Sequence, residues 1–225
     1  MRTAIASFGK QIGSWLAIWA LVLAFGANAQ VLINEVDSDD AGTDNLEFVE
    51  LVGTPGASLT GLVIVFFNGA TDQSYAAFDL DGMTLDVNGL FVLGNSAVVS
   101  VDMIFANDLL QNGADAVALY TANATNFPTN TPVTTTNLVD ALVYDTSDAD
   151  DAGLLVLLNA AQPQVDENAG GTGTALSMTR CPDGAGGARN TTGYLVRTPT
   201  PGSANDCSVA VEQETWGGVK KRFHD

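Results

Sequence analysis

Lysine and histidine are absent between Gln30 and Val211, and arginine is scarce there. This stretch contains 23 Asp and Glu residues against three Arg residues, so its net charge is 3 − 23 = −20. A surface of this charge repels phosphate backbones, and we therefore expect no nucleic-acid partner. Ser–His and Cys–His nucleophiles need a neighbouring base. The stretch supplies none, because the only histidine, His224, lies near the C-terminus.

Tryptophan is also scarce, since Trp216 is the only one beyond the first thirty residues. A glycoside hydrolase needs only two carboxylates for its chemistry, but such enzymes usually bind sugars on aromatic surfaces. A metal-dependent hydrolase requires imidazole ligands or a fixed carboxylate cluster with an open coordination position. The sequence shows no such constellation. We therefore predict that the chain is not an enzyme and has no catalytic residues.

Long hydrophobic runs are few, and the most prominent one lies at the start of the chain. The run from Trp15 to Phe25 follows the basic residues Arg2 and Lys10, and it is too short to span a bilayer. Small residues at 27–29 then provide a cleavage site before Gln30. This arrangement is typical of a secretory signal peptide. We expect residues 1–29 to be removed, and the mature chain to be extracellular or periplasmic with no transmembrane segment.

Cysteine occurs only twice, at Cys181 and Cys207. An isolated pair in an exported chain is read as one disulfide bond, because the compartment is oxidising. The alternative is a pair of free thiols. We expect the bond to form.

Short apolar segments rich in β-branched and aromatic residues make up most of the remaining chain. Turn residues such as Asn-Gly and Asp-Gly separate them, and helical periodicity is scarce. One short helix is expected within 151–161 and a long surface loop within 121–137. Many short strands at this spacing predict an all-β fold, an antiparallel β-sandwich. The expected strands are 31–36, 46–52, 62–67, 74–80, 89–94, 115–121, 137–144, 174–180 and 193–197.

Several segments, taken in order, resemble the lamin tail domain in its exported bacterial form. INEVDSDDAGTDNLEFVEL (33–51) and LTGLVIVFFNG (59–69) resemble its opening strands. Later strands are matched by GLFVLG (89–94), DAVALY (115–120) and NLVDALVY (137–144), and the end by SMTRCPDG (177–184) and RTPTPGSAND (197–206). The resemblance covers about residues 31–207. It implies an immunoglobulin-like β-sandwich and no reaction.

The resemblance also implies a role. In exported bacterial proteins this domain is usually regarded as a binding or tethering module, sometimes joined to an extracellular nuclease domain. Only eighteen residues follow Cys207, so we expect no nuclease domain here. We predict a signal peptide (1–29), a sandwich domain (30–207) and a tail (208–225) that is either a docking peptide or a frayed end. The expected function is adhesion, tethering or scaffolding through an unknown extracellular or envelope protein. The alternatives are a calcium-binding structural domain and an accessory module of an extracellular nuclease or hydrolase.

Two nearly identical acidic stretches raise the question of calcium. DSDDAG (37–42) and DADDAG (148–153) both carry the first acids and the glycine of an EF-hand loop, but each lacks its fifth and twelfth ligands. Calcium sites in β-sandwiches need not follow that template. We therefore keep Asp37, Asp39, Asp40 and Asp44 as candidate metal ligands at a strand end. The alternative is a solvated turn, because Asp and Gly are ordinary turn residues.

Two glutamates on neighbouring strands form a second candidate pair. If the strands that carry Glu35 and Glu50 pair with each other, the two carboxylates approach, share a cation or acquire a raised pKa. The alternative is that each points to solvent or accepts a hydrogen bond from a backbone amide. We favour the alternative, because structural carboxylates are commoner than tuned ones.

Overall fold

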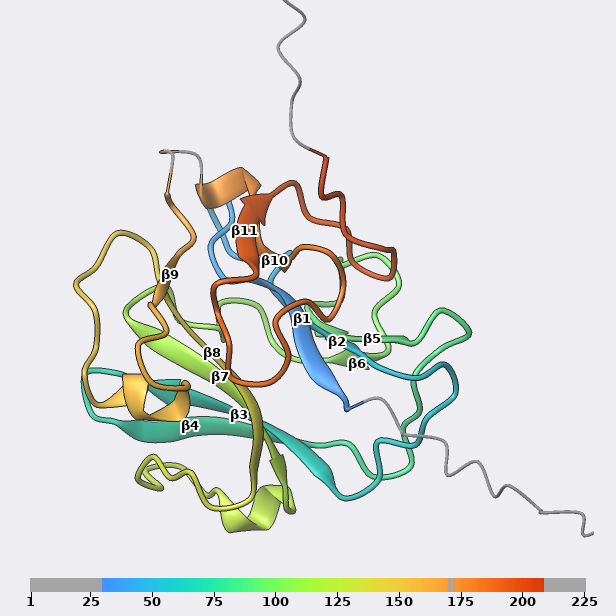
Figure 1. Cartoon of the computed structure of the whole chain (residues 1–225), viewed down its shortest axis with the longest axis horizontal. Coiled ribbons are helices and arrows are strands. Elements are labelled where there is room, and N and C mark those ends of the chain that lie inside the picture. The colour runs from blue at the N-terminus through green and yellow to red at the C-terminus, as the bar shows by residue number, and fades with distance from the viewer. Residues whose placement is uncertain (1–29, 170, 172, 209–225) are drawn as a thin grey trace, which may run out of the picture.

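The computed structural model describes residues 30–169, 171 and 173–208. The predicted signal peptide, and the predicted tail beyond Ser208, lie outside the described residues. Within them the chain forms two β-sheets that pack face to face (Figure 1). The predicted all-β sandwich is confirmed.

The first sheet has six strands, and the N-terminal strand lies inside it. Its order is β11 (Tyr194–Arg197), β10 (Ser177–Arg180), β1 (Leu32–Asp37), β2 (Phe48–Val52), β5 (Leu90–Gly94) and β6 (Met103–Ile104). All neighbours in this sheet pair antiparallel except β5 and β6, which pair parallel over two residues. β1 therefore joins the last two strands of the domain to its early hairpin.

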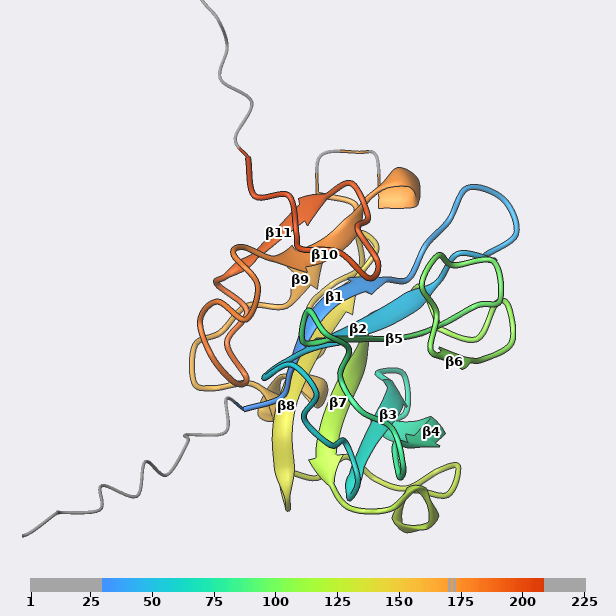
Figure 2. The same cartoon turned by 90° about the vertical axis from the view of Figure 1, so that its right-hand side faces the viewer.

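The second sheet has five strands and lies beneath the first in Figure 2. Its order is β4 (Gln73–Asp79), β3 (Leu62–Asn68), β7 (Asp115–Thr121), β8 (Leu138–Asp145) and β9 (Val165–Asp166). Only the short pair β8 and β9 is parallel. The nine expected strands are all present, whereas β6 and β9 were not predicted. Two residues are too few to show a hydrophobic period, so the sequence carries no signal for either.

Side chains from the inner faces of both sheets form the main core. Ile33, Val36 and Leu51 of the first sheet are buried in the same cluster as Phe66 and Leu119 of the second. This arrangement follows from strand alternation, because every second side chain points to the same face. Residues 48–51 of β2 are all buried, so this strand is covered on both of its faces.

A β-bulge in β1 decides which acids face outward. Ile33 pairs with Leu51, but Glu35 pairs with Glu50, so Asn34 is an extra residue in β1. Without this insertion, the strand period of two would place Ile33 and Glu35 on the same face. With it, Ile33 and Val36 both point into the core, and Glu35 is moved to the outer face.

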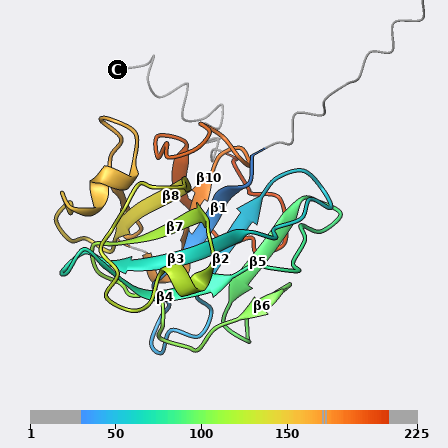
Figure 3. The ribbon, with the colours of Figure 1, turned by 90° about the horizontal axis from the view of Figure 1, so that it is seen from below.

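The outer face of the five-stranded sheet is covered by apolar loops. Figure 3 views the molecule from below, where the segment 122–137 crosses over β3 and β7. Phe127 from this segment and Leu154 from the turn η2 (Leu154–Leu157) bury Val65 and Phe67 of β3. The expected surface loop is present and includes the short 3-10 turn η1 (Ala124–Asn126). The helix expected within 151–161 is only the single 3-10 turn η2.

A buried ion pair joins the two sheets. The guanidinium of Arg180 on β10 lies 2.8 Å from the Asp140 carboxylate on β8, and neither side chain is exposed to solvent. Arg180 also donates to the Ile33, Ala185, Gly187 and Asn190 carbonyls and lies over the Tyr194 ring. A buried charge is tolerated only when it is paired and hydrogen-bonded in this way.

Candidate functional site

Three carboxylates lie together on the outer face of the six-stranded sheet. Glu35 is paired directly with Glu50, and Asp37 is paired with Phe48. All three acids are buried, with exposed fractions of 0%, 0% and 3% for Glu35, Glu50 and Asp37. Burial without a cation is unusual for acidic side chains, which are rarely buried unless paired. Their hydrogen-bond partners therefore decide what each one does.

Glu35 holds the segment that follows β11. Its carboxylate accepts hydrogen bonds from the Thr200 amide and the Thr200 hydroxyl, both at 3.0 Å. The hydroxyls of Ser177 and Thr179 on β10 donate to the same carboxylate. Burial raises the pKa of Glu35, and these hydrogen bonds oppose the rise. Glu35 thus links β1, β10 and the chain beyond Arg197.

Glu50 holds the same segment at a second point. It accepts a hydrogen bond of 2.7 Å from the Gly202 amide and one of 2.9 Å from the Asn34 side chain. Burial, with a smaller effect of the nearby charges of Glu35 and Asp183, raises the pKa of Glu50 to about 8, and the hydrogen bonds from Asn34 and Gly202 oppose the rise. Gly202 has a φ of +75°, and a Cβ there would lie 2.4 Å from Ser100, so only glycine fits this close approach.

We call residues 198–207 the C-terminal strap. The strap runs across the outer face of the six-stranded sheet and is closed by the disulfide between Cys181 and Cys207, whose Cα atoms are 5.3 Å apart. The predicted disulfide is confirmed. For Glu35 and Glu50, the expected contact with backbone amides is confirmed, while the expected solvent exposure is wrong. The strands do pair, and both pKa values are raised, because the strap excludes water from the two carboxylates.

Asp37 differs from its two neighbours because the strap does not reach it. Its Oδ1 atom is buried and has no hydrogen-bond partner among the described residues. Burial raises the pKa of Asp37 well above its ordinary value, and the charges of Glu167 and Asp40 raise it further. Among the described residues, Asp37 is therefore a buried acid whose Oδ1 atom has no donor and whose strongest charged neighbours are acidic.

A hollow of about 390 Å³ opens beside Asp37. Asp37, Asp40 and Thr174 are its polar lining residues, and the other lining residues are apolar, among them Leu46, Phe48, Val98, Pro199 and Pro201. The two prolines belong to the strap. The hollow therefore lies where the acidic loop, the sheet and the strap meet, and it combines apolar walls with a carboxylate.

The acidic loop, residues 38–46, is ordered by hydrogen bonds within the loop and to residues outside it, including Asn112. The Asn112 amide nitrogen lies 3.1 Å from both Asp39 Oδ1 and Asp44 Oδ2. Asp40 accepts a hydrogen bond from the Leu46 amide. Asp39 and Asp44 thus meet at Asn112, whereas Asp37 and Asp40 border the hollow. Within the described ranges, no group of three or more His, Cys, Asp or Glu residues is arranged to hold a metal ion.

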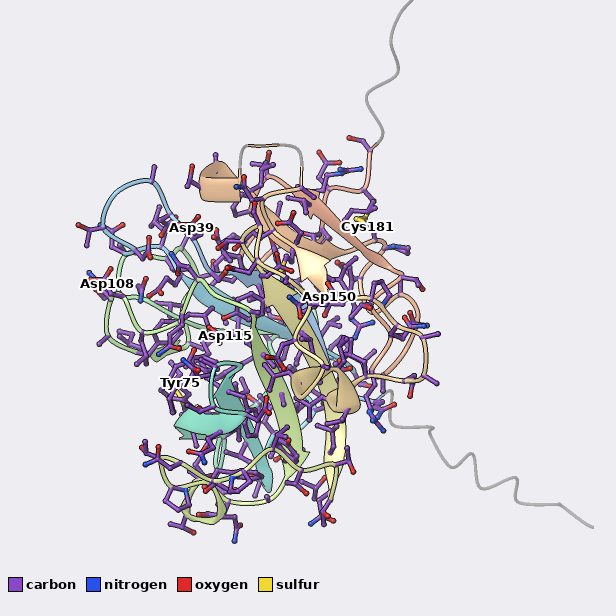
Figure 4. All side chains as sticks on the ribbon, turned by 90° about the vertical axis from the view of Figure 1, so that its left-hand side faces the viewer. Asp39, Tyr75, Asp108, Asp115, Asp150 and Cys181 are labelled. Carbon is purple, nitrogen blue, oxygen red and sulfur yellow. A yellow bond between two sulfur atoms is a disulfide. The ribbon has the colours of Figure 1, made fainter. Side chains whose placement is uncertain are left out.

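The second acidic stretch lies elsewhere in the molecule. In Figure 4, Asp39 and Asp108 lie on neighbouring loops on one side, while Asp150 is well separated from them. Asp151 accepts a hydrogen bond from the amide of Leu154, the first residue of η2. Asp148 and Asp151 border a different hollow, together with Asp115. The two similar sequences therefore do not form one site.

Two further buried acids were not predicted as site residues. Glu47 accepts from Asn95 and from the Leu109 amide, and burial raises its pKa to about 7. Glu167 accepts from the amide and hydroxyl of Ser38, and burial raises its pKa to about 8. Strand alternation places Glu47 on the same face as Val49 and Leu51, so its burial could have been predicted from the sequence. The polar sequence around Glu167 contains no pattern that predicts burial.

Comparisons with protein-family models, with curated proteins and with solved structures found no match. The resemblance to the lamin tail domain therefore stays a prediction. Across the described residues, no helix has the length and apolar character needed to cross a membrane. The disulfide bond is compatible with an exported protein.

Proposed function

We propose that this chain is an exported, non-catalytic domain of the lamin-tail type that tethers or scaffolds proteins outside the cytoplasm. The observation that carries the proposal is the fastening of the C-terminal strap. Thr200 and Gly202 are bound by buried carboxylates, and Cys207 is bonded to Cys181. Whatever follows the strap is thereby attached to the sheet at a fixed point, which suits a module that transmits a load between partners.

The buried polar groups support the non-catalytic part of the proposal. Glu35 and Glu50 are occupied by donors from the strap, and Arg180 is occupied by Asp140 and four carbonyls. The domain from Gln30 to Cys207 also contains no histidine or lysine to act as a base. A nucleophile in this domain has no imidazole or amine partner, which Ser- and Cys-dependent mechanisms use.

Binding to a cell-envelope fraction tests the proposal. The mature chain, residues 30–225, is incubated with washed envelopes of the producing cells, and the retained protein is compared with that of the reduced and alkylated chain. We expect retention of the intact chain to exceed that of the reduced chain several-fold. Equal retention contradicts a tethering role. Recovery with a secreted nuclease or hydrolase instead of the envelope supports the accessory-module alternative.

A second candidate function is calcium-dependent ordering of the acidic loop. The observation in its favour is the convergence of Asp39, Asp44 and Asn112. Carboxylate and amide oxygens are calcium ligands, and rotation of the Asn112 amide places its oxygen where its nitrogen now lies. The loop and Asn112 thus bring together three of the six to eight oxygen ligands that calcium takes.

Thermal unfolding tests this candidate at matched ionic strength. Calcium at about a hundred times its dissociation constant stabilises a folded state by ~2.7 kcal/mol, which is several degrees in melting temperature. We expect this rise with calcium chloride and not with sodium chloride, and we expect Asp39→Asn with Asp44→Asn to remove it. Asp148→Asn with Asp150→Asn, in the second acidic stretch, is the charge-matched control because both residues are exposed. An equal response of all three proteins shows that the loop is a solvated turn.

A further inference from the structure

Asp37 is a buried acid to which no side chain or amide of the described residues donates a hydrogen bond at Oδ1. Its side chain is 3% exposed, and its Oδ1 atom accepts no hydrogen bond within the described part of the chain. More than nine in ten buried polar groups in proteins have a partner, so an exception requires an explanation. Glu35 and Glu50, on the same sheet face, show that this fold supplies donors to buried carboxylates elsewhere.

The charges around Asp37 are all of one sign. The groups with the largest effect on it are Glu167, Asp40, Glu35 and Asp39. Arg180, the buried cation of the domain, is paired with Asp140. An external cation at Asp37 therefore meets an unopposed negative field in a poorly solvated place, where electrostatic attraction is stronger than in water.

The walls of the hollow select the kind of cation. Calcium takes six to eight oxygen ligands, but beside Asp37 the wall is formed by carbon atoms of Leu46, Phe48 and Val98. An ammonium ion on an aliphatic chain matches both the Asp37 carboxylate and the apolar wall. Its N–H groups donate to a carboxylate, and its methylene groups pack against carbon. The volume of about 390 Å³ is in the range of small-molecule sites.

We propose that this hollow is a binding site for a small primary aliphatic amine, with the ammonium group on the Asp37 carboxylate and the alkyl chain along Leu46, Phe48 and Val98. Asp40, which also borders the hollow, adds negative charge beside the bound group. Pro199 and Pro201 also line the hollow, so the strap that Glu35 and Glu50 hold in place is part of the site. The site is independent of the tethering role and of the acidic-loop pair Asp39 and Asp44.

Titration of the mature chain with n-butylammonium chloride tests the proposal, with amide NMR shifts as the readout. We expect saturable shifts at Asp37, Phe48 and Val98, with ammonium chloride binding at least about tenfold more weakly because it lacks the alkyl chain. Asp37→Asn should weaken butylammonium binding by about tenfold or more. Asp150→Asn removes the same charge from an exposed position and should leave binding unchanged.

A second variant keeps the test independent of Asp37. Ala175 is exposed and borders the hollow, so Ala175→Phe fills the space while leaving the carboxylate in place. We expect this variant to lose binding of butylammonium and to keep the wild-type melting temperature. The proposal is overturned if wild type shows no saturable shifts around the hollow, or if Asp37→Asn and Ala175→Phe both bind as wild type does.

Discussion

The outer faces of the two sheets are covered by different chemistry. On the five-stranded sheet, Phe127, Leu154 and Leu157 cover the strands with carbon. On the six-stranded sheet, the strap is attached through the carboxylates of Glu35 and Glu50. Apolar burial does not depend on protonation, whereas burial of a carboxylate raises its pKa and couples folding to pH. One face of the sandwich should therefore be indifferent to pH, and the other should respond to it.

The largest effect is expected from the apolar face. Leu154 is fully buried in the outer cluster, so Leu154→Ala removes packed carbon and leaves a cavity. We expect the free energy of unfolding to fall by about 2–5 kcal/mol. Denaturant unfolding at about pH 5 and about pH 8 checks this, and the loss should be the same at both values because no titratable group is changed. A loss that differs between the two pH values contradicts the contrast between the faces.

Removal of the disulfide should have the next largest effect, on the other face. Cys181 and Cys207 are separated by 26 residues in the sequence. Cys181→Ser with Cys207→Ser should lower the free energy of unfolding by ~3–4 kcal/mol on the chain-entropy model, and by less if the strap stays attached through its carboxylates. Urea unfolding measures the loss. No change would show that the strap is not part of the cooperative unit.

The pH dependence of the wild type should be opposite to ordinary acid denaturation. The pKa of Glu50 is raised from 4.5 to about 8 on folding, so the folded state binds more protons than the unfolded state between these values. The resulting stabilisation is complete below the lower pKa and is lost as pH rises through the upper one. Glu167 adds the same trend, because its pKa is also raised to about 8.

Glu50→Gln isolates the contribution of one carboxylate to this trend. Gln resembles the protonated acid, so the variant should match wild type at about pH 5 and exceed its stability at about pH 8, on the order of 1–2 kcal/mol. Chemical denaturation at the two pH values measures the difference. Asp150→Asn controls for the general repulsion in so acidic a chain. If the free energy of unfolding of Glu50→Gln falls between the two pH values as much as that of wild type, the prediction is wrong.

The smallest effect is expected at Asp37. Asp37→Asn removes a buried charge that has no donor, so the free energy of unfolding should rise by about 1 kcal/mol at about pH 8. At about pH 5 the rise should be smaller, because burial raises the pKa of Asp37 and more of the wild-type carboxyl is protonated as pH falls. Thermal unfolding at the two pH values checks this. Destabilisation of the variant at both would show that Asp37 has a partner.

Strand positions were predictable because β-branched and aromatic residues alternate with turn residues over five or more positions. The bulge at Asn34 was not predictable, since no local pattern marks it, and it is the feature that places Glu35 outside the core. Burial of Glu35 and Glu50 depends on Thr200 and Gly202, which follow them by 165 and 152 residues. A contact between residues so far apart in the sequence does not change the alternation of polar and apolar residues along a strand, so that alternation cannot reveal it.

The acidic stretches also show what could not be predicted from the sequence. Composition correctly marked the first one as polar and turn-rich, but it could not separate Asp37 from Asp39. Asp37 is the last residue of β1 and faces the hollow, whereas Asp39 faces Asn112 on a different loop. Two positions of sequence therefore separate an unpartnered buried acid from a hydrogen-bonded one. The register of β1 determines that Asp37, and not Asp39, is the unpartnered buried acid.

We claim that buried carboxylates attach the strap to the sheet, and amide hydrogen exchange of the strap tests this claim. In wild type, the Thr200 and Gly202 amides should exchange slowly, and the Ala204 amide should exchange quickly. In Glu35→Ala with Glu50→Ala, protection of Thr200 and Gly202 should be lost while that of Val49 in β2 is kept. Fast exchange of Gly202 in wild type, or unchanged protection in the variant, would contradict the claim.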